Sequence, residues 1–250
     1  MKRSTLWFFI FLVSASLLFD CKKEYLPMGN LEPGVALTFD DASLDKWLEL
    51  LPIFQKYNAK VTFFICTSCT DNPLDKSKVI QLAEAGNEIG SHSHHHAYLK
   101  QYLSTHSLPD YYKYEIVPSL QFFDSINIPV SSFAYPYGEH TSESDKFLSQ
   151  YFHKIRGICS LRLSEDGAFI IHKNTILVNG ADFDRASHNH LEDYKRAIIQ
   201  AKEHNAVLVL IGHSPDSNST NDWSFPVELL DSICSFSVQQ NMKFYRMQDL

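Results

Sequence analysis

The chain has 250 residues, of which 44% are hydrophobic, and this is enough to bury the core of one sizeable domain. Its 29 acidic and 22 basic residues leave a formal net charge of −7, and no basic stripe runs through the sequence. This balance argues against a nucleic-acid partner, because nucleic-acid-binding domains carry clustered lysine and arginine.

The first twenty residues have the pattern of a bacterial export signal. Basic residues at 2–3 are followed by an apolar stretch over 6–19, shorter than the roughly 20 residues that span a bilayer, so we predict a signal peptide at 1–20. The stretch ends at Cys21 and resembles a lipoprotein signal, in which that cysteine becomes the acylated N-terminus, although Asp20 stands where a small neutral residue is usual. The resemblance implies an exported protein of the bacterial cell envelope. It would be anchored to the membrane by a lipid on its periplasmic or surface face, with ordinary secretion as the alternative.

The rest of the chain is predicted to be one α/β domain at 34–250, joined to the signal by a tether at 21–33 that is rich in proline and glycine. Apolar strand-like runs alternate with amphipathic segments, and apolar residues recur at helical spacing over 44–54 and 191–201. Continuous apolar strands that alternate with helices are typical of a parallel sheet covered on both faces. We therefore predict a distorted β/α barrel of about seven parallel strands. The expected strands are 35–39, 61–65, 88–91, 132–135, 157–160, 206–211 and 243–246, with 175–178 as an extra candidate.

Polar residues follow the ends of several predicted strands. Asp40 and Asp41 follow the first strand, His92 follows the third, and His213 follows the apolar run 206–211. The carboxyl ends of the strands form the face on which β/α barrels build their active sites. The sequence therefore predicts that these side chains gather on one rim.

Two adjacent carboxylates and a histidine cluster at 92–96 together indicate a metal site. Neighbouring buried carboxylates repel each other, and a divalent cation removes that cost. His92 and His96 with one aspartate would supply three ligands and leave a position open, as catalytic zinc sites do. The spacing leaves open which of Asp40 and Asp41 binds the metal and which acts as a base. The structural alternative is a strand end with a helix N-cap and a solvent-exposed polar loop.

His213 is a candidate general acid, because an imidazole titrates near neutral pH and could protonate a leaving amine or alkoxide. An imidazole in this role needs a carboxylate that holds its tautomer. Asp182 and Asp184 are the candidates, with Asp182 as the first choice. His94 and His95 are expected to be bystanders.

The motifs resemble, in their order, those of the polysaccharide deacetylases, the family 4 carbohydrate esterases. The resemblance runs from about residue 34 to the C-terminus, and it is carried by TFDD at 38–41, HSHHH at 92–96, YPYG at 135–138 and the strand that ends at His213. It implies a distorted, roughly seven-stranded β/α barrel. It also implies one divalent metal ion, usually zinc, with Co²⁺, Ni²⁺ or Mn²⁺ as alternatives.

The resemblance also implies roles for individual residues. Asp40 would be the catalytic base, and His213 the acid. The backbone at Tyr137 would help to hold the oxyanion. The metal ligands would be Asp41, His92 and His96.

Two departures from the family pattern stand out. Ala134 occupies the position where the third motif often has an arginine that pairs with the base. From this loss we expect a raised pKa of Asp40 and an orientation set by other groups. The fourth motif, an aspartate-tryptophan element, has no clean counterpart.

These observations predict a metal-dependent hydrolase that removes acetyl groups from an envelope or extracellular polysaccharide, with N-acetylglucosamine units as the first choice. The alternatives are a hydrolase of the same fold acting on another ester or amide, such as O-acetyl xylan, and a catalytically silent glycan-binding lipoprotein that keeps the metal. Five aromatic residues could line a sugar groove or serve ordinary packing: Tyr98, Tyr102, Tyr111, Tyr135 and Trp223. Four further cysteines are expected to be buried thiols or to form one bridge: Cys66, Cys69, Cys159 and Cys234.

Overall fold

The computed structural model describes residues 31–69, 73–160, 169–170 and 175–250. The predicted signal peptide, Cys21 and most of the predicted tether lie outside the described residues. Within the described ranges, no helix is both long enough and apolar enough to cross a membrane.

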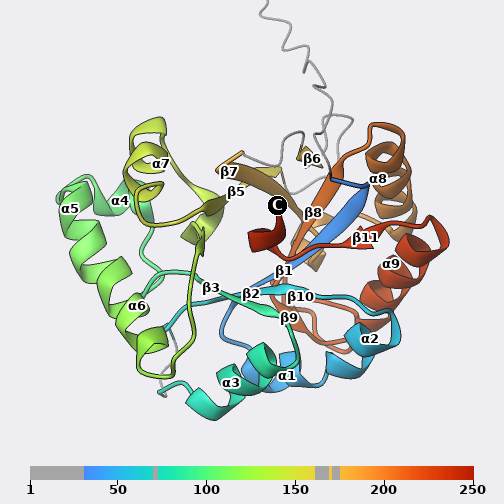
Figure 1. The fold of residues 1–250 in the computed structure, drawn as a ribbon, viewed down its shortest axis with the longest axis horizontal. Coiled ribbons are helices and arrows are strands. Elements are labelled where there is room, and N and C mark those ends of the chain that lie inside the picture. Colours follow the sequence, from blue (N-terminus) through green and yellow to red (C-terminus); the bar gives the residue numbers. More distant parts are fainter. Residues whose placement is uncertain (1–30, 70–72, 161–168, 171–174) are drawn as a thin grey trace, which may run out of the picture.

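Seven parallel strands form a closed barrel, as the sequence predicts (Figure 1). The ring closes because β8 pairs with β1 along six residues, from Gly34 opposite Val207 to Phe39 opposite Gly212. The seven strands are β1 (Gly34–Asp41), β2 (Thr62–Ile65), β3 (Glu88–Ser91), β4 (Ser132–Ala134), β5 (Lys154–Ser160), β7 (Leu177–Asp182) and β8 (Val207–Gly212).

Two short strands pair with barrel strands at the end of the barrel where those strands begin. β11 (Lys243–Phe244) pairs with the start of β1, and β6 (Phe169–Ile170) runs antiparallel to the start of β8. The segment 243–246 is therefore an edge strand and not one of the seven, while the extra candidate at 175–178 belongs to the barrel strand β7. β7 is hard to recognise because Asn179, Gly180 and Asp182 interrupt its apolar pattern.

Helices surround the barrel in Figure 1. The helix expected over 44–54 is two short helices, because Pro52 has no N–H to donate to the carbonyl of residue 48 and a new helix starts around it. The helices are α1 (Leu44–Leu48), α2 (Leu51–Lys56), α3 (Lys76–Glu84), α4 (Leu99–Tyr102), α5 (Leu108–Tyr111), α6 (Val117–Asp124), α7 (Ser142–Leu148), α8 (Leu191–Glu203) and α9 (Val227–Gln239). A π-helix, η1 (Tyr112–Ile116), joins α5 to α6. Short 3₁₀ turns are η2 (Pro136–Gly138), η3 (Arg185–Ser187) and η4 (Met247–Asp249), and a separate strand pair is formed by β9 (Ser214–Pro215) and β10 (Ser224–Phe225).

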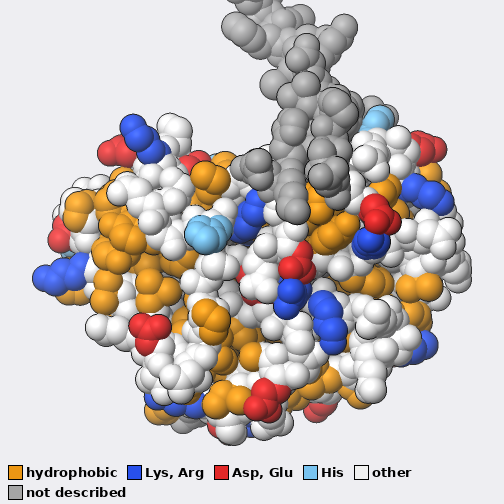
Figure 2. Space-filling view, viewed as in Figure 1, with side chains coloured by type: hydrophobic (Ala, Val, Ile, Leu, Met, Phe, Trp, Pro, Cys, Tyr) orange, Lys and Arg blue, Asp and Glu red, His pale blue; other side chains and the backbone are white. Residues whose placement is uncertain are grey.

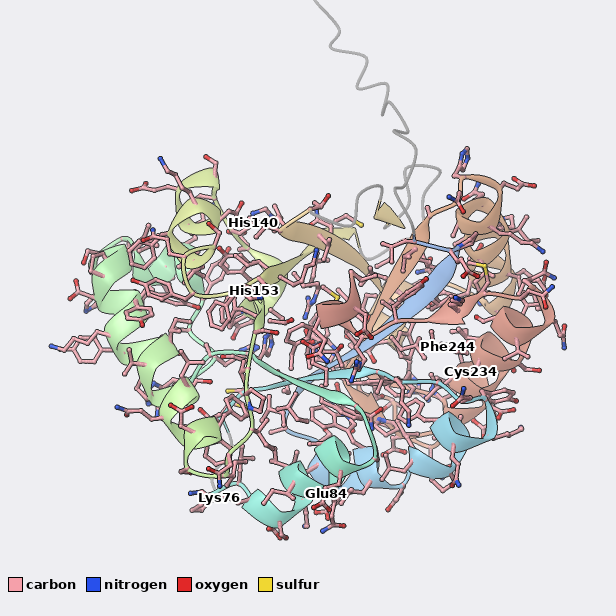
Figure 3. The ribbon with its side chains drawn as sticks, in the orientation of Figure 1. Lys76, Glu84, His140, His153, Cys234 and Phe244 are labelled. Atoms are coloured by element: carbon pink, nitrogen blue, oxygen red, sulfur yellow. The ribbon has the colours of Figure 1, made fainter. Side chains whose placement is uncertain are left out.

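The hydrophobic core has an inner and an outer part. The outer part lies between strands and helices, and it includes Cys234 of α9, on the same side of the barrel as Phe244 of β11 (Figure 3). The inner part fills the barrel with small and branched side chains together with Phe64 and Met247. The four cysteines at 66, 69, 159 and 234 form no disulfide within the described residues. Cys66 and Cys234 are buried, as expected, whereas Cys69 and Cys159 are exposed, so the expectation of burial is wrong for these two.

The C-terminal turn covers the end of the barrel at which the strands begin, and Figure 1 places the C-terminus near the centre of the ring. The N–H of Met247 donates to Thr62 Oγ1 at 2.9 Å, and the N–H of Gln248 donates to Glu88 Oε2 at 2.9 Å. Acidic and basic side chains lie among one another on the face drawn in Figure 2. The opposite end of the barrel, where the strands finish, is left for the polar residues described next.

Candidate active site

The end of β1 brings two consecutive carboxylates to one place. In an extended strand Asp40 and Asp41 would point to opposite faces, but the φ of Asp41 is 82°, which breaks this alternation. His92, directly after β3, is therefore close to both: its Nε2 lies 3.8 Å from Asp40 Oδ2 and 3.7 Å from Asp41 Oδ1. Asp40 is buried, whereas the side chain of Asp41 is 38% exposed and lines a cavity of about 660 Å³.

The histidine cluster turns back on itself through left-handed residues. The φ of Ser93 is 68° and that of His96 is 60°, and Ser93 Oγ accepts the N–H of His96 at 3.0 Å. This tight loop places His96 Nε2 3.2 Å from His92 Nε2 and 3.3 Å from Asp41 Oδ1. The three ligands that the family resemblance implies therefore converge, with their ligand atoms within 4.8 Å of one another.

The chemistry of these three groups fits a divalent cation. His92 Nδ1 lies 2.9 Å from the carbonyl oxygen of Ala134, which can only accept, so this nitrogen carries the proton and Nε2 presents a lone pair. Burial lowers the pKa of His92 to about 4, so its ring is neutral at pH 7. Asp41 Oδ1 has no hydrogen-bond partner among the described residues. A lone pair and a carboxylate oxygen that face each other without a proton need a cation between them.

A second acidic cluster lies beside the first and is already paired. His213 Nδ1 contacts Asp184 Oδ2, and the backbone N–H of His213 donates to Asp184 Oδ1 at 3.2 Å. Asp182, the first choice from the sequence, instead accepts the backbone N–H of Asp184 at 2.7 Å. The partner of His213 is therefore Asp184, because Asp182 ends β7 with its carboxylate turned onto the next peptide unit.

Asp184 determines the charge of His213. Burial alone would lower the pKa of this imidazole, but the hydrogen bond and the charge of Asp184 raise the pKa of His213 to about 10. His213 therefore carries a proton at neutral pH and is equipped to donate it. Trp47 Nε1 donates to the His213 carbonyl at 2.7 Å, and the Trp223 ring lies 5.3 Å from the imidazole ring, so the histidine is held on two sides. Burial and the nearby Asp184 raise the pKa of Asp182 to about 7.

Arg156 corrects the expectation that Asp40 has lost its cation. Its fully buried guanidinium contacts Asp40 Oδ2 from β5, the strand next to the one that carries Ala134. Burial alone would raise the pKa of Asp40, but Arg156, with smaller contributions from His92 and His213, holds the pKa of this carboxyl below its usual value. Asp40 is therefore ionised at neutral pH, as a base must be.

The YPYG segment forms one wall of the cavity. Tyr137 has a φ of 58°, is 59% exposed, and packs its ring 4.6 Å from the ring of His96 and 5.3 Å from that of Tyr98. Of the aromatic residues considered from the sequence, Tyr98 and Trp223 thus lie at the site. Tyr111 and Tyr135 are fully buried and Tyr102 packs on the same cluster, so these three serve the core.

The two remaining histidines of the cluster hold the loop. His94 Nδ1 lies 2.8 Å from Thr67 Oγ1, and His95 Nδ1 lies 3.0 Å from Glu115 Oε1. Glu115 Oε2 also accepts the backbone N–H of His95 at 2.8 Å. His94 and His95 are thus absent from the ligand set. They have a structural role, because their contacts hold the histidine loop against Thr67 and Glu115.

Comparisons with known proteins identify the family and the fold. The family model described as "Polysaccharide deacetylase" matches residues 29–154. A chitin deacetylase of Arthroderma benhamiae is 42% identical over 72 residues, which cover 28% of this chain and 19% of that protein. The chain therefore matches about a fifth of the length of this curated relative.

Solved structures share the fold. A family 4 carbohydrate esterase from Streptomyces lividans in complex with acetate superposes with a TM-score of 0.56 at 17% identity, covering 86% of this chain and 92% of that one. The catalytic domain of a peptidoglycan N-acetylglucosamine deacetylase from Eubacterium rectale gives 0.57 at 16% identity, covering 87% and 90%. A mutant of a family 4 pseudoenzyme with restored enzymatic activity gives 0.59 at 18% identity, covering 88% and 67%.

Proposed function

Because the chain belongs to the polysaccharide deacetylase family, we propose that it is a metal-dependent hydrolase that removes acetyl groups from N-acetylglucosamine units of an envelope or extracellular polysaccharide. The observation that carries the proposal is the convergence of Asp41, His92 and His96 between an ionised Asp40 and a protonated His213. The likeness to a chitin deacetylase supports an acetylated glycan as the substrate.

Asp41, His92 and His96 would hold the metal ion. A divalent ion bound there acts as a Lewis acid toward the acetyl carbonyl and makes a water molecule more acidic. Zinc suits a set of two imidazoles and one carboxylate, with Co²⁺, Ni²⁺ and Mn²⁺ as alternatives.

The protein's own groups would manage the protons. Asp40 accepts the proton of the attacking water, and its Oδ1, which has no hydrogen-bond partner in the described part of the chain, is the oxygen available for it. The developing oxyanion is stabilised by a backbone N–H at Tyr137. His213 then protonates the departing amine nitrogen, while Asp184 keeps the imidazole in the required orientation. Base and acid are thereby separate residues with opposite charges at neutral pH.

The arrangement favours catalysis over a silent binding role. A protein that only bound glycan would have no need for a buried ion pair on Asp40 or for a carboxylate on His213, and both are costly to bury. We further propose export and lipid attachment at Cys21, which would hold the domain at the cell envelope.

Acetate release tests the proposal. The full chain, purified in detergent and stripped of metal, is given zinc and then acetylated chitooligosaccharides or peptidoglycan fragments. We expect zinc-dependent release of acetate, which Asp40→Asn lowers by about 100-fold or more because the base is lost. Asp124→Asn, an exposed aspartate at the end of α6, is the matched control.

Zinc binding separates the alternatives. One bound equivalent without acetate release from either substrate would overturn the proposed substrate and favour another acyl group or a binding role. Failure to bind zinc would overturn the ligand set itself.

A further inference from the structure

We propose that Arg156 is the positioning residue for Asp40, acting from β5 across the inside of the barrel. We further propose that the arginine and the alanine can exchange places between positions 134 and 156 and keep this role. The inference rests on the proposed deacetylase function. It assigns a role to a residue that lies outside every motif found in the sequence.

The side chains involved point into the interior of the barrel. Asp40 is the register partner of Phe64, and Phe64 is the register partner of Gly90. Arg156 is the register partner of Ala134 on one side and of Val178 on the other. Register partners on neighbouring parallel strands point to the same side of a sheet, and Phe64, Ala134 and Val178 belong to the inner core cluster. Asp40 and Arg156 therefore both point into the interior of the barrel.

Small residues leave the space that the arginine crosses. A Cβ on Gly90 would lie 2.5 Å from Phe64 Cδ1, so only glycine lets the Phe64 ring take its position. The guanidinium carbon of Arg156 lies 5.4 Å from the centre of that ring, and the side chain has no exposed surface. Ala134 adds only a methyl group beside it. The Arg156 side chain therefore extends through this space, beside the Phe64 ring, to the carboxylate of Asp40.

The contact is made to one oxygen only. The Nη2 group of Arg156 contacts Asp40 Oδ2, whereas Oδ1 has no partner among the residues described. Arg156 thus fixes the rotation of the carboxylate and leaves the other oxygen for the proton. A base that is displaced by about 1 Å commonly loses two orders of magnitude in rate, so this orientation matters for catalysis.

The register predicts that the arginine can change strand. Ala134 and Arg156 are paired on neighbouring parallel strands, whose backbones lie about 4.8 Å apart. An arginine at 134 with an alanine at 156 would place the guanidinium at the same height in the sheet, pointing into the interior from β4. The carbonyl of residue 134 that contacts His92 Nδ1 is backbone and would be kept.

The experiment compares the full-length wild type with Arg156→Ala, Arg156→Lys and the double variant Ala134→Arg/Arg156→Ala. Each protein is loaded with zinc, and kcat, KM, zinc affinity and the melting temperature are measured. We expect Arg156→Ala to lower kcat about 100-fold, with KM and zinc affinity within about threefold of the wild type. Arg156→Lys should lose about tenfold, because lysine carries a point charge on a shorter side chain and lacks the planar face that lies over the Phe64 ring. The double variant should regain at least about tenfold over Arg156→Ala.

Each result decides between defined outcomes. If Arg156→Ala does not fold, Arg156→Lys and the double variant decide. The positioning role is overturned if the wild type is active and either Arg156→Lys or Arg156→Ala keeps kcat within about threefold of the wild-type value. A folded, zinc-binding double variant without any recovery overturns the interchange. Loss of zinc affinity in parallel with kcat would assign Arg156 to the metal site instead. An inactive wild type would overturn the proposed function, and this inference with it.

Discussion

Asp184 is the residue on which the acid half of the site depends. It contacts both Nδ1 and the backbone N–H of His213, and it keeps this imidazole charged well above the pH at which a free histidine loses its proton. Because the acid must be protonated to act, kcat/KM falls as the pH rises through the pKa of His213. The raised pKa therefore extends activity toward alkaline pH.

Replacing Asp184 by asparagine should move this alkaline limit. Without the carboxylate charge, the pKa of His213 falls toward its ordinary value near 6.5, so the alkaline limb of kcat/KM should move to lower pH by about one pH unit or more. The pH profile of acetate release measures it. Asp182→Asn is the matched control, because an amide oxygen can still accept the N–H of Asp184. An unchanged alkaline limb in Asp184→Asn would contradict the assignment of His213 as the acid.

The sequence identifies the polar residues at strand ends more readily than the residues that support them. Asp40, Asp41 and His213 stand at the ends of apolar runs, and His92 follows the predicted strand 88–91, so their placement is visible without a structure. Arg156 is not visible in the same way. It lies inside a strand that the sequence predicts only from residue 157, and its partner is 116 positions away. The choice between Asp182 and Asp184 depends on a local turn, which strand periodicity does not encode.

The π-helix η1 is the element that supports the histidine loop. Pro118 follows it and lacks the N–H that would bond the carbonyl of residue 114, which favours an irregular turn at this point. The turn carries Glu115, which is buried and holds both the backbone and the ring of His95. Glu115 therefore fixes the residue that precedes the ligand His96.

Removing this anchor should weaken metal binding without removing a ligand. We expect Glu115→Ala to lower zinc affinity by about 10- to 100-fold, the usual effect of losing a group that orients metal ligands. A competition titration with a chelator measures it. Glu49→Ala, at an exposed position after α1, serves as the control. Full zinc affinity in a folded Glu115→Ala protein would show that the loop holds itself.

The elements themselves were predictable to different degrees. Strands with unbroken apolar runs, such as β1 and β8, are found at nearly their observed bounds. β7 is obscured by its polar residues, and β11 is too short to complete a barrel. Closure of the ring depends on pairing between β1 and β8, which are far apart in the chain. No local pattern encodes this pairing, so closure is predicted only from the number of strands.

At the scale of the whole molecule, the two ends of the barrel have different tasks. One end is covered by the C-terminal turn and its bonds to Thr62 and Glu88, and the other carries the polar rim. A protein anchored through a tether before β1 would be attached near the covered end, because β1 begins there. The rim would then face away from the membrane, toward a polymeric substrate.

Cys21→Ala tests the anchor. If Cys21 is acylated, this change should move the protein from the membrane fraction to the soluble fraction and abolish labelling by a palmitate analogue. Cell fractionation and labelling measure both effects. Cys69→Ala, at an exposed cysteine of the domain, should leave them unchanged. Membrane association that survives Cys21→Ala would contradict lipid anchoring and favour another mode of attachment.

The Arg156–Asp40 pair also constrains how this site could have arisen. A chain with arginine at both 134 and 156 would bury two guanidinium groups against one carboxylate, and a chain with neither would bury the carboxylate alone. Single substitutions between the two arrangements therefore pass through a destabilised intermediate. Lineages with the cation on different strands would be separated by a barrier, and exchange between them would require paired mutations. A search that demands arginine at position 134 would discard a chain with alanine there as inactive, even when an arginine at 156, on the neighbouring strand, supplies the charge.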